Sequence, residues 1–229
     1  MSQKLTIVLD LDGTLIETAP DLIKAHNHVM KKFGFQSKYE NDIKKLVGKG
    51  ASSLITRSVW GEAQKNFSKI DSDKIKKEMI NEFIDFYSKN ICVESKLLNG
   101  VKNFLDWSKQ KNISLGVCTN KQEYLAVDLL KQIGIYEYFE YVAGSNTFNF
   151  CKPDPRHLTN VIEIMQGDIK KSIMIGDSET DAETAKLAGV PFILLENGYT
   201  EKKTSEIHHD HLVKDFVGIE EIISKYLNH

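Results

Sequence analysis

One apolar stretch near the N-terminus constrains the fold more than any other part of the sequence. Residues 5–9 are apolar or β-branched without interruption, and Asp10 and Asp12 follow them directly. Such a run is typical of a strand that is buried on both faces inside a parallel sheet. Gly13 allows the chain to turn sharply, and Thr14 adds a hydroxyl group. We therefore predict that the chain leaves a central strand here and places two carboxylates at its carboxyl end.

The two aspartates also indicate a metal site. Carboxylates one residue apart repel each other, so ionising both is unfavourable unless a cation lies between them. Mg²⁺ prefers oxygen ligands, and ligands of open α/β sheets bind just outside the carboxyl ends of the strands. An ordinary Asp-rich turn is the alternative interpretation. Asp-x-Asp-Gly-Thr is expected by chance in only about one chain of this size in several hundred, which favours the metal site.

Hydrophobic spacing divides the chain into two parts. In residues 16–92 no strand is predicted, and helical spacing predicts helices over about 19–33, 41–47, 51–60 and 71–89. From residue 98 onward helices and strands alternate, which is typical of a parallel sheet covered by helices on both faces. We predict a Rossmann-like α/β core formed by residues 1–15 and 93–229, with residues 16–92 inserted as an all-helical cap domain.

The second part is predicted in more detail from the same spacing. The expected strands cover 113–118, 138–143, 172–175 and 192–195. The expected helices cover about 101–111, 121–133, 156–165, 180–188 and 216–227. The segment that contains His208, His209 and His211 is expected to be a loop without a metal site.

Composition and charge exclude several classes of protein. The formal net charge of -2 provides no basic field for nucleic acid. No apolar stretch is long enough to span a bilayer, and the N-terminus has no signal-peptide pattern. The three cysteines, Cys92, Cys118 and Cys151, form no CxxC pair, which favours a reducing compartment. We therefore expect a cytoplasmic globular protein with neither nucleic acid nor a membrane as partner, either a monomer or a homodimer.

Polar residues follow two further predicted strands. Thr119 and Asn120 come after one strand and are expected to cap the next helix, where a hydroxyl and free N–H groups suit a phosphate. Asp177 follows Gly176 at the end of another strand, and Asp181 lies one helical turn further on. Because parallel strands end at one edge of a sheet, these side chains are predicted to meet Asp10.

Lys152 is the fourth predicted element of the site. Pro153 and Pro155 restrict the backbone on its C-terminal side, which suits a lysine that must point inward. Most lysines lie on the surface, so the prediction that Lys152 belongs to the site depends on the presence of the other three segments.

Taken together, these segments resemble the motifs of the haloacid dehalogenase superfamily, in the same order. The motifs are Asp10-Leu-Asp12-Gly-Thr, Thr119-Asn120, Lys152-Pro-Asp-Pro and Gly176-Asp177-Ser-x-x-Asp181. The resemblance covers nearly the whole chain, and the helical insert matches the C1 cap of that superfamily. Within it, residues 18–21, 47–51 and 152–158 are most similar to the phosphoglycolate phosphatase family.

The resemblance implies a role for each residue. Asp10 is expected to attack phosphorus and form an aspartyl-phosphate, while Asp12 protonates the leaving group and then activates water. Mg²⁺ is expected at the Asp10 carboxylate, the Asp12 carbonyl and Asp177, with Asp181 either supporting the metal or orienting Lys152. The residues expected to bind and neutralise the phosphoryl group are Thr119, Asn120 and Lys152.

The helical insert is expected to provide part of the substrate site. Lys49 and Gly50, in the segment Gly48-Lys49-Gly50, are predicted to face the cleft and bind the carboxylate of the substrate. An ordinary turn between helices is an almost equally good interpretation of this segment. Arg57 is a weaker second candidate.

The preferred function is Mg²⁺-dependent hydrolysis of a small phosphomonoester, with 2-phosphoglycolate as the first choice. The acid at position 12 argues against dehalogenase activity. A phosphosugar mutase similar to β-phosphoglucomutase and a pyrophosphatase remain open, because both types of reaction fit the same motifs. A non-catalytic module that binds Mg²⁺ or phosphate is the alternative from another class, against which the intact set of acids and lysine speaks.

Overall fold

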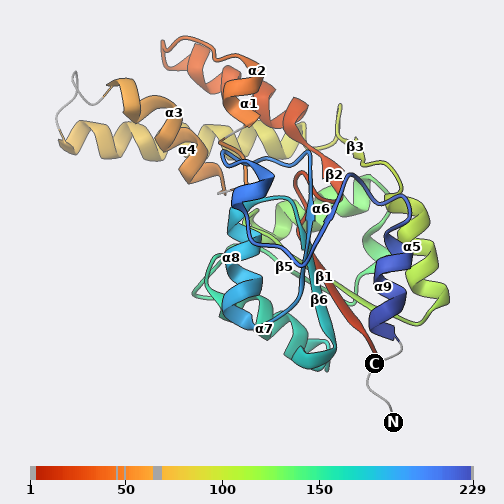
Figure 1. Ribbon diagram of the computed structural model, residues 1–229. Helices are drawn as coiled ribbons and strands as arrows, with labels where there is room; N and C mark the ends of the chain where they lie inside the picture. Colours follow the sequence, from red (N-terminus) through yellow and green to blue (C-terminus); the bar gives the residue numbers. More distant parts are fainter. Residues whose placement is uncertain (1–3, 45, 49, 64–68, 228–229) are drawn as a thin grey trace.

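A six-stranded parallel sheet forms the centre of the protein. The computed structural model describes residues 4–44, 46–48, 50–63 and 69–227 (Figure 1). The strands lie in the order β5-β4-β1-β6-β7-β8, and each neighbouring pair is parallel. Their bounds are β1 Thr6–Leu9, β4 Ser114–Cys118, β5 Tyr141–Ala143, β6 Ser172–Gly176, β7 Phe192–Leu195 and β8 His211–Val213. The predicted α/β fold is confirmed, and the segment before Asp10 is the central strand β1.

Helices cover both faces of this sheet. Their bounds are α5 Val101–Gln110, α6 Glu123–Gln132, α7 Pro155–Ile164, α8 Glu179–Ala188 and α9 Ile219–Leu227. Ile7 and Leu9 of β1 point into one apolar cluster with α5, α6 and α9, whereas Val8 points into a second cluster with α7 and α8. The alternation along β1 explains why its sequence is apolar at every position: each face of the strand is buried under helices.

The helical insert leaves and rejoins the core through two short paired strands. β2 (Ile16–Glu17) and β3 (Lys96–Leu97) are antiparallel, with Ile16 opposite Leu97. Between them lie α1 Ala19–Lys32, α2 Glu40–Lys44, α3 Gly50–Ala63 and α4 Lys69–Lys89. In Figure 1 these helices, red to yellow, lie together on one side of the sheet. The division into a core of residues 1–15 and 93–229 and a cap of 16–92 stays a prediction.

Buried polar contacts tie this junction to the core. The Tyr199 hydroxyl accepts hydrogen bonds from the backbone N–H groups of Thr18 (3.0 Å) and Ala19 (2.9 Å), and donates one to Glu17 (2.5 Å). On the other side, the buried Asp21 carboxylate accepts hydrogen bonds from three consecutive backbone N–H groups, those of residues 93–95. The start of α1 is thereby fastened both to a core loop and to the returning chain.

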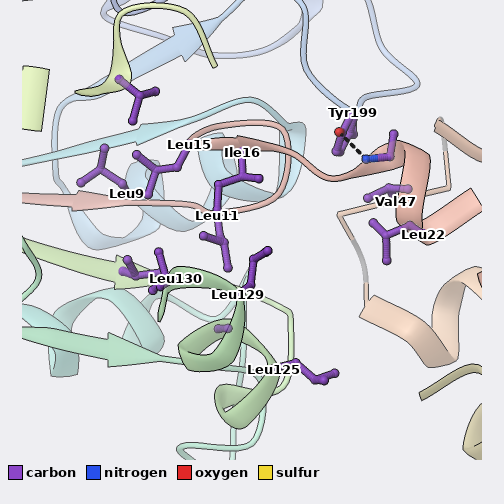
Figure 2. Close-up of a cluster of buried hydrophobic side chains, with 14 of the residues drawn as sticks. Leu9, Leu11, Leu15, Ile16, Leu22, Val47, Leu125, Leu129, Leu130 and Tyr199 are labelled. Carbon is purple, nitrogen blue, oxygen red and sulfur yellow. Dashed lines mark hydrogen bonds between the residues drawn. The ribbon is translucent and has the colours of Figure 1, made fainter. Parts of the chain in front are cut away.

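Apolar packing continues from the sheet into the same junction. Figure 2 shows Leu11, Leu15 and Ile16, which follow β1, above the leucines of α6. Tyr199 lies at the far end of this cluster, beside the beginning of the insert. The loop that carries Asp12 is therefore held between buried side chains, which restricts where its carboxylate can lie.

Several predicted elements differ from the observed ones. Three strands were not predicted: β2, which contradicts the expectation of no strand in residues 16–92, β3, and β8, which includes His211 of the segment expected to be a loop. Each has only two or three residues, too few for a periodic pattern to be recognised. Tyr136–Tyr138 forms a 3₁₀ helix, so the strand predicted from residue 138 begins only at Tyr141. Two further 3₁₀ helices cover Ile169–Lys171 and Thr204–Glu206.

Within the described part of the chain, none of the helices combines the length and the apolar character needed to cross a membrane.

Candidate active site

Three buried carboxylates meet where the central strands end. Asp10 follows β1, Asp177 follows the neighbouring strand β6, and Asp181 lies in the first turn of α8. One oxygen from each can be chosen so that all lie within 4.8 Å of one another. We call these three residues the carboxylate cluster. Parallel pairing of β1 and β6 explains the meeting, because it brings both carboxyl ends to the same edge.

Lys152 joins two members of the carboxylate cluster. Its Nζ donates to Asp10 Oδ1 at 2.7 Å and to Asp181 Oδ1 at 2.6 Å, and its side chain is only 2% exposed. Burial alone lowers the pKa of Lys152, but Asp10 and Asp181 outweigh this effect and raise it overall. The lysine therefore stays charged, as predicted for an inward-pointing residue.

The cluster is short of positive charge. Three carboxylates meet a single ammonium group, and burial raises the pKa of Asp10 to about 7 even though Lys152 opposes this shift. Burial, and then the Asp10 charge, raise the pKa of Asp177 as well. Oxygen ligands of this kind fit a hard divalent cation, which would supply the missing charge and keep the acids ionised.

Both carboxylate oxygens of Asp181 accept hydrogen bonds. While Oδ1 accepts from Lys152, Oδ2 accepts from the Ser178 hydroxyl at 2.6 Å and its N–H at 3.1 Å. Ser178 is the N-cap of α8 and accepts in return from the Asp181 N–H, forming a capping box. These contacts hold the Asp181 carboxylate against Lys152, and its two expected roles stay predictions.

The Asp177 carboxylate is held by the two loops that surround it. Thr14 Oγ1 donates to Oδ1 at 3.1 Å, and the Tyr199 N–H donates to Oδ2 at 2.6 Å. Glycines make this approach possible, since a Cβ at Gly13 or Gly198 would lie only 2.3 Å from an atom of the Asp177 side chain. Gly13 also has a φ of +83°, a conformation that other residues rarely adopt.

The backbone N–H and carbonyl groups of Lys152 are both hydrogen-bonded to neighbouring side chains. His157 is fully buried, and its Nδ1 accepts from the Lys152 N–H at 3.2 Å. Asn120 Nδ2 donates to the Lys152 carbonyl at 3.1 Å. Burial, with a contribution from the Lys152 charge, lowers the pKa of His157 to about 4, so the ring is neutral at pH 7. A neutral ring is what allows its nitrogen to accept this hydrogen bond.

Asp12 has a partner that the sequence analysis missed. Lys121 Nζ donates to both carboxylate oxygens of Asp12, at 2.8 and 3.0 Å, and both side chains are nearly buried. The same Nζ lies 4.7 Å from the ring centre of Tyr87, which comes from α4 in the insert. Asp12 is thus separate from the carboxylate cluster and paired with its own lysine.

A cavity of about 250 Å³ lies between this edge and the insert. Asp10, Asp12, Thr119, Asn120 and Lys121 line its core side. The opposite side consists of apolar residues of the insert, which we call the insert wall: Leu22, Val47, Leu54, Ile80, Phe83 and Ile84. Tyr87, Gly48 and residues 50–52 also line the cavity.

The second predicted motif is placed differently from expectation. Thr119 and Asn120 do not cap the next helix: α6 begins at Glu123, and its N-cap is Gln122. The Thr119 N–H instead donates to the Ala143 carbonyl, and its hydroxyl accepts from the Lys121 N–H. The loop continues along the cavity before the helix starts, so the expected helix cap at Thr119 and Asn120 is wrong, whereas phosphate binding by these residues stays a prediction.

Insert residues predicted to bind substrate have mixed outcomes. Lys49 lies outside the described residues. Gly50 begins α3 and lines the cavity, whereas Arg57 pairs with Glu201 and is not one of the described cavity-lining residues.

Among the described hydrogen bonds, none joins a cysteine or a tail histidine to the carboxylates of the site, although Cys151 lines the cavity. Cys118 is buried and its pKa is raised mainly by that burial, which disfavours a reactive thiolate. His211 bonds to the Tyr226 hydroxyl, and His209 to the Ile207 carbonyl. Among the described residues, the only group that could hold a metal ion is the carboxylate cluster.

Comparison with known proteins gives a consistent result along the chain. The model of the haloacid dehalogenase-like hydrolases matches residues 7–195. A phosphoglycolate phosphatase of Agrobacterium fabrum is 37% identical over 95% of this chain and 94% of its own length. The phosphoglycolate phosphatase of Mesorhizobium japonicum is 36% identical over 92% and 90%. The crystal structure of a predicted phosphoglycolate phosphatase from Haemophilus somnus superposes with a TM-score of 0.89 at 29% identity, covering 97% of this chain and 99% of that one.

Proposed function

The chain belongs to the haloacid dehalogenase-like hydrolases, and we propose that it is a Mg²⁺-dependent phosphatase acting on a small phosphomonoester, with 2-phosphoglycolate as the preferred substrate. The observation that carries this proposal is the lysine-bridged carboxylate cluster beside a cavity lined by Asp10 and Asp12. Relatives named phosphoglycolate phosphatases support the choice of substrate. The three free cysteines fit a cytoplasmic enzyme.

Asp10 is the proposed nucleophile. Its carboxylate lines the cavity and is oriented by Lys152, so one oxygen is directed and the other is available to attack phosphorus. Attack forms an aspartyl-phosphate and breaks the bond between phosphorus and the ester oxygen. Water then attacks the phosphorus of this intermediate, which releases phosphate and restores the Asp10 carboxylate.

Asp12 is the proposed proton donor and acceptor. It lines the same cavity two residues from Asp10 and lies outside the carboxylate cluster. Once protonated, it gives its proton to the leaving oxygen, and in the second step it takes a proton from the attacking water.

Charge on the transferring phosphoryl group needs fixed positive partners. Lys152, the Thr119 hydroxyl and backbone N–H groups of the Asn120 loop are the proposed donors. Asp10 and Asp177, with the Asp12 carbonyl, are the proposed ligands of Mg²⁺, and Asp181 positions Lys152. When bound, Mg²⁺ supplies charge neutralisation at the phosphoryl oxygens.

Phosphate release with Mg²⁺ tests the proposal. The substrates are 2-phosphoglycolate, sugar phosphates, nucleoside monophosphates and pyrophosphate, and Asp10→Asn is the control. A preference for 2-phosphoglycolate that Asp10→Asn abolishes is the expected result. Substantial turnover by Asp10→Asn contradicts the covalent mechanism, and slow release from every ester favours the mutase.

A further inference from the structure

Lys121 and Tyr87 place an ammonium group and a hydroxyl group at the cavity, and the proposed phosphoryl transfer uses neither group as a donor to the substrate. Lys121 is the only Lys or Arg among the described residues that line the cavity. Tyr87 is 1% exposed, lines the same cavity beside Lys121, and its hydroxyl donates to no acceptor among the described residues. A buried hydroxyl proton without an acceptor is costly, so a donor of this kind facing a cavity indicates a missing acceptor.

We propose that Lys121 and Tyr87 form a subsite for a second anionic group of the substrate, on the side of the leaving alcohol. This inference rests on the proposed phosphatase function and assigns the residues that bind the carboxylate of its preferred substrate. Lys121 supplies the charge, and Tyr87 supplies a neutral donor from the insert. Ammonium and hydroxyl donors together suit a carboxylate.

The position of Lys121 limits how far this anionic group lies from the ester. Asp12 must come within hydrogen-bond distance of the leaving oxygen to protonate it. Lys121 Nζ is 2.8 and 3.0 Å from the oxygens of that same carboxylate. Three successive hydrogen bonds therefore separate the leaving oxygen from the bound anion, a path of about 9 Å at most. Hydroxy acids with two or three carbons lie well within this limit.

The rest of the cavity disfavours a polyol. The insert wall offers apolar side chains over much of the leaving-group side. Sugar hydroxyls placed against it would lose hydrogen bonds to water without replacing them. In contrast, α3 begins at Gly50, and residues 50–52 line the cavity, so the positive end of that helix favours an anion there.

A matched pair of substrates tests the subsite. Ethyl phosphate has the two-carbon skeleton of 2-phosphoglycolate but lacks the carboxylate. The measured quantity is the ratio of kcat/KM for the acidic ester to kcat/KM for ethyl phosphate. Any effect that Lys121→Met transmits through Asp12 changes both esters alike and cancels in this ratio.

We expect the ratio to fall about 10- to 100-fold in Lys121→Met, as for a lost hydrogen bond to a charged group, with the KM for the acidic ester rising. Tyr87→Phe is expected to lower it about 3- to 10-fold. This second variant removes only a hydroxyl that donates to no described acceptor, so we expect it to fold even if Lys121→Met does not. Lys131→Met and Tyr136→Phe are the matched controls, because this pair has the same lysine-over-ring contact outside the cavity.

The outcomes separate the two proposals. If the wild-type protein hydrolyses both esters equally, or if both cavity variants leave the ratio unchanged, the subsite is wrong and the phosphatase stands. If the wild-type protein hydrolyses neither ester nor any other phosphomonoester, the proposed function itself fails, and the subsite fails with it.

Discussion

The two sides of the cavity are built from different interactions. On the core side, each carboxylate of the site has at least one charged or hydrogen-bonding partner at a defined distance, and glycines allow the loops to approach. On the insert side, most of the lining is apolar, and Tyr87 contributes the one tyrosine hydroxyl described there.

This difference indicates that the chemical step and substrate binding depend on different sides of the cavity. Charge–charge contacts and hydrogen bonds depend steeply on position, so the core side is sensitive to displacements of a few tenths of an ångström. Apolar contacts are individually weak and less directional, so the insert side tolerates change better. We expect substitutions on the core side to affect the chemical step and those on the insert side to affect substrate binding.

The largest expected effect follows from removing the charge of Lys152. Lys152→Met leaves Asp10 and Asp181 without their shared partner and removes a donor to the transferring phosphoryl group. We expect kcat for the preferred substrate to fall about 1000-fold. Steady-state kinetics measure this, with Lys96→Met, an exposed lysine in β3, as the control. A kcat within tenfold of the wild type would show that the core side is less exacting than its contacts indicate.

A second expected effect, of about 3 kcal/mol, is the dependence of the free energy of unfolding on pH. His157 has a pKa of about 4 in the folded protein and an ordinary value near 6.5 when unfolded. Its contribution to the free energy of unfolding is therefore complete above pH 6.5 and is lost as the pH falls toward 4. His157→Asn keeps an acceptor for the Lys152 N–H but cannot titrate.

Urea unfolding at pH 7, 6 and 5 measures the part of this effect, about 2 kcal/mol, that develops between pH 7 and pH 5. The wild-type protein is expected to lose stability more steeply than His157→Asn, while His28→Asn, on α1 of the insert, provides the comparison. His26 is also buried with a lowered pKa, so a smaller slope remains in His157→Asn. Parallel slopes for wild type and His157→Asn would rule out this role.

Alanine substitutions at two glycines distinguish the effect of steric crowding from that of backbone strain. Gly13 and Gly34 both have positive φ, +83° and +78°, but only Gly13 is packed against another residue, Asp177. We expect Gly13→Ala to displace Asp177 and weaken Mg²⁺ activation about 10- to 100-fold. Gly34→Ala carries the backbone cost alone, so its Mg²⁺ dependence should match the wild type. The Mg²⁺ concentration for half-maximal activity distinguishes them, and equal values would contradict the crowding argument.

The smallest expected effect lies on the insert wall. Ile84→Ala removes part of an apolar, half-buried side chain from the cavity lining. Lost apolar contact of about 1 kcal/mol corresponds to roughly fivefold in kcat/KM. We expect this change in KM, with kcat nearly unaffected, in the same steady-state assay. A large drop in kcat would mean that the insert also positions the reacting groups.

The sequence allowed the polar edge of the sheet to be predicted because its residues follow strong strand signals. Asp10 and Asp177 come directly after apolar runs, and parallel pairing of neighbouring strands brings such positions together. The proline-flanked Lys152 was predicted to point inward for a similar local reason, and it does so.

The missed residues have no such local signal. Lys121 lies in a polar loop, where a lysine is normally exposed, and only the fold brings it to Asp12. Tyr87 belongs to the buried side of α4, where an aromatic residue is typical of core packing. Its proposed role depends on a cavity formed between two separate parts of the chain, which periodicity within one helix cannot reveal.

The paired strands β2 and β3 have a consequence for how such a protein can change. The chain departs at Ile16 and returns at Leu97, which lie opposite each other. The segment between these two residues leaves the core and returns to it at the same place. Lengthening, shortening or exchanging this segment therefore leaves the register of the main sheet unchanged. Duplication followed by divergence of this segment alone would leave the carboxylate cluster and Lys152 unchanged and alter the insert wall of the cavity. The same two positions are natural splice points for chimeras between relatives.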